Sequence, residues 1–175
     1  VMVMKKSLLI VISMVAVLLI SAFITFNFYT TSRTLHTLNY LNEHLDAGGV
    51  RLGMPDREVQ QLLGSGIFID GFGGYAREYP ELGLLLSFPT DQENDLHDSV
   101  SHMEMTNPEY SVFGIRVGDD PHEALALLRQ KRFRPVDDSP DTVRLGEFSI
   151  KLSGQDSIAA IHIRFDDKDL RDILY

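Results

Sequence analysis

The first pattern along the chain is a predominantly apolar run over residues 7–29, which contains no charged residue. As a helix this run would extend about 34 Å at about 1.5 Å per residue, which is enough to cross the hydrocarbon core of a bilayer. Lys5 and Lys6 precede it, and basic flanks stay on the cytoplasmic side of a membrane. The pattern predicts a single-pass transmembrane anchor in the cell membrane, with residues 1–6 in the cytoplasm and the C-terminal domain extracytoplasmic.

A cleaved signal peptide is the alternative interpretation of this run. Signal peptides usually have an apolar stretch of about 7–15 residues that ends in small residues. The best cleavage point here follows Ala22, and Phe23 and further aromatic residues would then remain at the new terminus. We therefore expect an uncleaved anchor that contacts membrane lipid. Leucines at helical spacing over residues 30–47 predict a juxtamembrane helix after it.

The rest of the chain contains two stretches with similar sequences. Residues 49–53 and 114–118 share the pattern Gly-x-Arg-x-Gly, and a glutamate follows each at the same distance. The shared polar and glycine positions are Arg51, Gly53 and Glu58 in the first copy and Arg116, Gly118 and Glu123 in the second. Self-similarity in the same order indicates a duplicated structural unit. We predict two tandem repeats, over residues 48–107 and 108–175.

Both copies have the same pattern of apolar positions. Each contains an apolar stripe at i, i+3 and i+4, formed by Val59, Leu62 and Leu63 and by Ala124, Leu127 and Leu128, which predicts a short helix. Asp120 can cap the second helix, ahead of Pro121. Runs of strand-forming residues follow each helix, at 74–79, 82–88 and 100–105, and at 142–145, 148–152 and 158–165. The predicted fold class is α+β, with a short helix and about three antiparallel strands in each copy.

Composition and charge exclude some classes of function. The chain has 175 residues, of which 44% are hydrophobic and 23% charged, as in globular proteins. Its formal net charge of -9 argues against a nucleic-acid partner, because nucleic-acid binding depends on basic surfaces. The absence of cysteine excludes disulfides, thiolate metal sites and cysteine nucleophiles.

The first copy resembles a known family. The stretch over residues 50–64, VRLGMPDREVQQLLG, is similar to the signature I-x-x-G-M-s-x-x-E-V-x-x-L-L-G of the SmpA/BamE-like outer-membrane assembly lipoproteins. The tandem arrangement resembles that of the β-lactamase inhibitory protein. These resemblances imply a helix-plus-sheet domain that works by presenting a sheet face and loops to another protein.

A cluster of acidic residues is the candidate cation site. Its members are Asp91, Glu93, Asp95 and Asp98, and it points to an alternative function as an extracytoplasmic ligand or cation sensor. A calcium loop of the EF-hand type needs glycine at its sixth position and glutamate at its twelfth, where this chain has Leu96 and His102. We therefore expect a solvated loop, with no metal and no cofactor.

Catalytic residues do not form a recognisable set in the sequence. Ser65 lies between two glycines but lacks the G-x-S-x-G context of a serine nucleophile. His162 alternates with Ile161 and Ile163, which predicts a strand residue on the face opposite to the isoleucines.

We therefore predict a non-catalytic protein-interaction domain whose partner is another protein of the cell envelope. Within it, the arginine and glutamate of each repeat signature are expected to pair as scaffold elements.

Overall fold

The computed structural model describes residues 14–23, 35–92 and 94–166. The chain divides into two compact units, Val1–His36 and Thr37–Tyr175. In the first unit, residues 14–23 form a helix whose side chains are exposed. The rest of the predicted anchor, at 7–13 and 24–29, lies outside the described residues, as does the predicted cytoplasmic segment 1–6.

No helix in the described part of the chain is both long enough and apolar enough to cross a bilayer.

The second unit is built on one antiparallel sheet. Its eight strands follow the order β2-β3-β4-β5-β10-β9-β8-β7. The first half comprises β2 (Ile67–Gly71), β3 (Gly74–Tyr79), β4 (Leu84–Pro89) and β5 (His102–Met105). The second half comprises β7 (Arg134–Val136), β8 (Ser139–Leu145), β9 (Phe148–Ser153) and β10 (Ala160–Phe165). The two halves join where β5 pairs with β10, with Met103 opposite Ile163 and Met105 opposite Ile161.

Short elements complete the unit. Helices α2 (Asp56–Leu63) and α3 (Pro121–Gln130) precede the strands of the two halves, and residues 35–43 are also helical. A short helix η1 (Pro80–Leu82) links β3 to β4, and β1 (Leu45–Asp46) pairs with β6 (Ser111–Val112). Asp120 caps α3 as predicted, because its carboxylate accepts the backbone N–H groups of His122 and Glu123.

The α+β class is therefore confirmed, but the number of strands was wrong. Each half contributes four strands to the large sheet instead of about three. The missed strands are the outermost ones. All five residues of β2 are exposed, so they lack the alternation that reveals a half-buried strand, and β7 has only three residues, of which one is Pro135.

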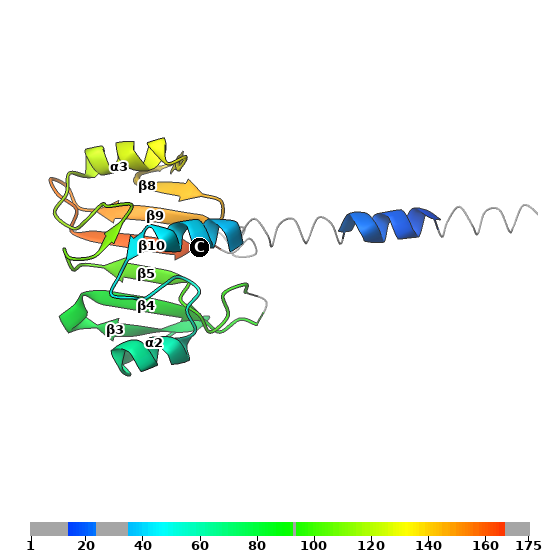
Figure 1. The fold of residues 1–175 in the computed structure, drawn as a ribbon, viewed down its shortest axis with the longest axis horizontal. Coiled ribbons are helices and arrows are strands. Elements are labelled where there is room, and N and C mark those ends of the chain that lie inside the picture. The colour runs from blue at the N-terminus through cyan, green and yellow to red at the C-terminus, as the bar shows by residue number, and fades with distance from the viewer. Residues whose placement is uncertain (1–13, 24–34, 93, 167–175) are drawn as a thin grey trace, which may run out of the picture. The chain divides into compact units, whose positions relative to one another are not determined.

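One hydrophobic core lies between the sheet and the helices. Along β4, Leu84, Leu86 and Phe88 are buried while the residues between them are partly exposed. Val59 of α2 and Leu128 of α3 are buried in the same core. In Figure 1, α2 lies beside β3 and α3 beside β8. The other face of the sheet carries the alternate residues, which are mainly polar on the central strands: Ser87 of β4, His102 and Glu104 of β5, and His162 and Arg164 of β10.

The glycines of the predicted repeat signatures occupy matching positions. The N–H of Gly53 donates to the carbonyl of Val100, and the N–H of Gly118 donates to the carbonyl of Ile158, both over 2.8 Å. Both glycines have positive φ, 77° and 99°. The order of elements is also the same in the two halves: a signature loop, a helix and then four strands.

Candidate functional site

The charged residues of the repeat signatures do not pair as predicted. Arg51, Glu58, Arg116 and Glu123 are all exposed, and the salt bridges of the described residues include none between them. Exposed ion pairs gain little free energy in water, so nothing draws these side chains together. Arg51 and Glu58 instead line a shallow surface hollow beside α2.

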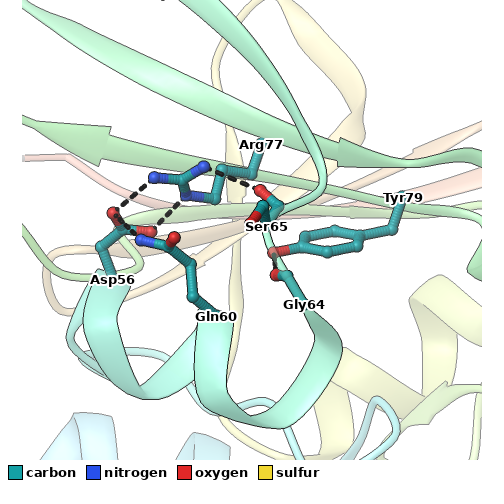
Figure 2. A network of polar contacts seen from close by, with 6 residues as sticks. All are labelled: Asp56, Gln60, Gly64, Ser65, Arg77 and Tyr79. Carbon is teal, nitrogen blue, oxygen red and sulfur yellow. Dashed lines mark hydrogen bonds and ion pairs between the residues drawn. The ribbon is translucent and has the colours of Figure 1, made fainter.

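The ion pair that stabilises this region joins Asp56 of α2 to Arg77 of β3 (Figure 2). Arg77 Nε donates to Asp56 Oδ1 over 2.5 Å, and Arg77 Nη2 donates to Oδ2 over 2.9 Å. The two side chains are only 12% and 15% exposed, with Arg77 the less exposed. Gln60, one turn along α2, adds a hydrogen bond to Oδ2. A two-bond pair of this kind fixes the orientation of both side chains.

Further hydrogen bonds attach the end of α2 to the same strand. Arg77 Nη1 donates to the carbonyl of Ser65 over 2.7 Å, and the Tyr79 hydroxyl donates to the carbonyl of Gly64 over 2.9 Å. The Arg77 guanidinium also lies 5.8 Å from the ring centres of Phe68 and Tyr75. Carbonyl groups at a helix end need partners, and Arg77 and Tyr79 supply them here.

Hydrogen bonds and the neighbouring arginine favour the charged form of the Asp56 carboxylate. Burial acts to raise the pKa of Asp56, but hydrogen bonds from Arg77, Tyr75 and Gln60 outweigh it, so the pKa lies below its ordinary value. Burial, and next the Asp56 carboxylate, raise the pKa of Tyr75 to about 12. Both carboxylate oxygens of Asp56 and all three guanidinium nitrogens of Arg77 have hydrogen-bond partners in the cluster. The cluster therefore holds α2 against β3.

A second polar cluster lies on the face of the sheet opposite the core. His102 of β5 and His162 of β10 stack with ring centres 6.0 Å apart, across the junction of the two halves. Ser153 Oγ lies 3.0 Å from His162 Nε2, and Glu104 Oε2 lies 3.6 Å from His162 Nδ1. As predicted, His162 points away from the core, and Ile161 beside it is fully buried.

The order of groups in Ser153, His162 and Glu104 is that of a serine–histidine–acid array. A distance of 3.6 Å between His162 Nδ1 and Glu104 Oε2 exceeds hydrogen-bond reach, so the carboxylate does not fix the imidazole as such an array requires. Burial, and next the charges of His162 and Arg164, lower the pKa of His102 to about 4. The structure therefore places Ser153, His162 and Glu104 together on a polar sheet face without a continuous hydrogen-bonded array.

The acidic loop does not form a metal centre in the part of the chain that is described. Over residues 35–92 and 94–166, no three His, Asp or Glu side chains come together to hold a metal ion. Glu93 lies outside the described residues. Asp98 Oδ2 instead lies 3.1 Å from His97 Nε2, and the backbone carbonyl of Asp98 accepts the N–H of Asp56. Asp91 and Asp95 lie in the same turn-rich loop.

The large apolar side chains exposed on the described second unit all come from residues 62–72. Among its described residues from Thr37 onward, the large apolar side chains that are exposed are Leu62, Ile67, Phe68, Ile69 and Phe72. We call these five residues the β2 patch. Phe72, at the tip of the β2–β3 hairpin, is 100% exposed, and Phe68 is 57% exposed. Ile67 and Ile69 lie on the opposite face of the strand from Phe68, so apolar side chains are exposed on both faces of this sheet edge. Exposed apolar surface of this kind indicates an interaction site.

The two edge strands of the sheet differ in how well they are protected against pairing with a further strand. β7, at one edge, is short and contains Arg134 and Pro135, which are features that discourage a further strand from pairing. β2, at the other edge, has neither lysine, arginine nor proline. Sequence reasoning missed the β2 patch, because no strand was predicted between the first repeat's helix and residue 74. The signal that could have revealed it is the apolar triplet Ile-Phe-Ile just ahead of the glycine-rich turn.

Comparison with known proteins assigns no family. No family model matches the chain, and no curated protein matches it. Among solved structures, it is similar to the crystal structure of an extracellular protein containing a SCP domain from Bacillus anthracis str. Ames, at 11% identity and a TM-score of 0.49. The match covers 69% of this chain and 45% of that one, so the chain spans less than half of that protein.

Proposed function

We propose that this chain is a membrane-anchored, extracytoplasmic and non-catalytic protein-interaction domain of a bacterial cell envelope. The anchor and its orientation rest on the apolar run over residues 7–29 and on the lysines before it. The observation that carries the interaction role is the β2 patch. It collects the exposed large apolar side chains of the described second unit on one helix end and one edge strand.

The physical argument is the cost of leaving this surface in water. Burying apolar surface contributes roughly 25 cal/mol per Å², and each large aromatic side chain supplies on the order of 150–250 Å² when fully buried. Phe72 reaches solvent with its whole side chain, and Phe68 with more than half of its surface. A partner that covers both gains binding free energy that folding of the domain itself does not use.

We also propose that the two halves are tandem repeats of one unit. Each half runs through the same elements, and its signature glycine donates to the residue shortly before its last strand. The halves pair through those last strands, β5 and β10, so one continuous sheet spans both. A duplicated unit that leaves one strand unpaired at each end creates two outer edges, and only the β2 edge is open.

Photo-crosslinking in cells tests the interaction role. A benzoylphenylalanine placed at Phe72 of the full-length protein should give a crosslinked adduct in the membrane fraction. The same probe at exposed Arg134 on the guarded edge is the matched control and should give none. The change Ile69→Ser in the Phe72 probe protein should reduce the adduct while leaving the melting temperature nearly unchanged, because Ile69 lies on an exposed edge. No adduct from probes at Phe72 and at Phe68 would contradict the proposal.

A further inference from the structure

We infer that the β2 edge binds a second copy of this chain, with the two β2 strands antiparallel and Phe68 on the twofold axis. This inference rests on the proposed role of the β2 patch as the binding surface, and it specifies the partner. Both copies carry the same predicted anchor, so the proposed partner lies in the same membrane.

The backbone of β2 is available for pairing on one side. β2 pairs with β3 and is the last strand of the sheet. A two-residue loop separates Gly71 from Gly74, and the pair that closes such a hairpin is hydrogen-bonded. Because hydrogen-bonded pairs alternate along an antiparallel ladder, the peptide groups of Phe68 and Asp70 face away from β3. A further strand must therefore pair through these two residues.

Only certain registers satisfy that condition for a symmetric pair. With Phe68 opposite Phe68 of the second copy, Ile67 lies opposite Ile69 on both sides of the axis. The three central pairs are then all apolar. Asp70 falls opposite Gly66, which places no side chain against the carboxylate.

The other symmetric registers are less favourable. Centring the pair on Ile69 puts Phe68 opposite Asp70, which places a carboxylate against an aromatic ring. Centring it on Asp70 puts two carboxylates opposite each other, and directly opposed like charges destabilise a strand pair. The net charge of -9 opposes association in every register, so a favourable register must gain free energy by burying apolar side chains. Centring the pair on Ile67 also keeps charge from the centre, but it puts Phe68 opposite Gly66 and Ile69 opposite Ser65. The register centred on Phe68 is the one that combines three apolar pairs with a centre free of charge.

Phe68 is already ordered for this role. Its ring stacks on Tyr75 with ring centres 5.4 Å apart, and the Arg77 guanidinium lies over it at 5.8 Å. A side chain that is held in place loses little conformational entropy when a partner covers it. The assembly also closes at two copies, because a twofold contact uses the same edge of both chains and leaves the guarded β7 edges outside.

Engineered cysteines test the register directly, since the natural chain has no cysteine. The full-length Phe68→Cys variant is oxidised in membranes and analysed for disulfide-linked dimer. Hydrogen-bonded antiparallel partners have Cα atoms about 5.5 Å apart, within the range of roughly 4.4–6.8 Å that a disulfide spans. Arg134→Cys, on the other edge, is the matched exposed control. Asp70→Cys is the register control, because the proposed pairing does not bring two copies of residue 70 together.

Dimer from Phe68→Cys at least tenfold above both controls is the expected result. Efficient dimer formation by Asp70→Cys, or none by Phe68→Cys, overturns the inference. If Phe68→Cys lowers the melting temperature markedly, coexpressed Ile67→Cys and Ile69→Cys chains replace it. The two coexpressed variants should form a disulfide-linked dimer, and each variant expressed alone should form it only weakly. Absence of the mixed dimer would also overturn the inference.

The photo-crosslinking result separates this inference from the proposed function. A Phe72 adduct with the mass of two copies of the chain supports both. An adduct with a different protein, together with no Phe68→Cys dimer, overturns the second copy as partner and leaves the interaction role intact. No adduct of any kind contradicts both.

Discussion

Arg77 on β3 receives the Asp56 carboxylate of α2 side-on, so that two guanidinium nitrogens each bind one carboxylate oxygen. The two residues are far apart in the sequence, yet this contact joins α2 to β3 of the sheet. Because both side chains are largely buried, neither can exchange its partner for water at low cost. This contact is a stability element, and it can be tested separately from binding.

The change Arg77→Ala should destabilise the domain by about 2–3 kcal/mol, because it leaves the Asp56 carboxylate partly buried without its main donor. The measurement is urea unfolding at neutral pH. Lys151→Ala removes a more exposed ion pair with Asp141, 3.6 Å long, and should cost less than about 1 kcal/mol. Equal losses from the two variants would show that the buried pair contributes no more than a surface pair.

The stability of the domain should depend on Asp56 at acid pH. Its folded-state pKa lies below the ordinary 3.8, so its contribution is present above that value and is lost as the pH falls through the folded pKa. Unfolding measured between about pH 5 and pH 2 should therefore show a steeper loss for the natural protein than for Asp56→Asn. Parallel curves for the two proteins would contradict the pKa assignment.

His102 should make a separate contribution at milder pH. Its folded-state pKa is about 4, below the ordinary 6.5, because burial and the neighbouring His162 and Arg164 disfavour the charged imidazole. The unfolded chain binds the proton first, so stability is full above pH 6.5 and falls between pH 6.5 and about 4. The expected loss is on the order of 3 kcal/mol, and His102→Gln should remove it. An NMR titration of the His102 ring with a midpoint near 6.5 would disprove this prediction.

The signature glycines should respond differently to alanine. Gly118 has φ of 99° and no atom within 4 Å of a new Cβ, so Gly118→Ala should cost only the backbone strain, about 1–2 kcal/mol. Gly53 has φ of 77° and the Leu38 side chain 3.2 Å away, so Gly53→Ala should cost more. Gly71→Ala is the control, because its φ is not in the positive range and its closest contact is 3.4 Å. Thermal unfolding of the three variants should follow the order Gly53, Gly118, Gly71, and another order would refute the argument.

Divalent cations should not stabilise the domain. The described residues hold no cluster of three potential metal ligands, so an excess of Ca²⁺ or Zn²⁺ should leave the melting temperature unchanged. A rise that the Asp95→Asn variant abolishes would restore the cation-sensor hypothesis for the acidic loop.

Strand prediction from the sequence worked where one face of a strand is buried. The strand at residues 74–79 was predicted with the bounds of β3, and five others were placed within a few residues. β2 escaped because exposure on both faces removes the alternation on which the prediction depends. The same physical property, apolar side chains left in water, makes β2 the candidate binding edge.

The polar clusters were beyond prediction for a different reason. Asp56 and Arg77 meet because α2 folds back on β3, and His102 stacks on His162 because β5 pairs with β10. Both contacts follow from strand order, which the local pattern does not contain. The predicted pairing of Arg51 with Glu58 failed for a related reason, since spacing alone does not reveal that both side chains are exposed.

By itself, the sequence determined what depends on neighbours along the chain: the apolar run, the short amphipathic helices, the cap at Asp120 and the internal matches. These features are local, because helix and strand periodicity act over a few residues. Only the tertiary structure decided that the two halves share one sheet, that Arg77 stabilises α2, and that Phe68 and Phe72 remain exposed. Burial is a property of what covers a residue, and the covering residues are distant in sequence.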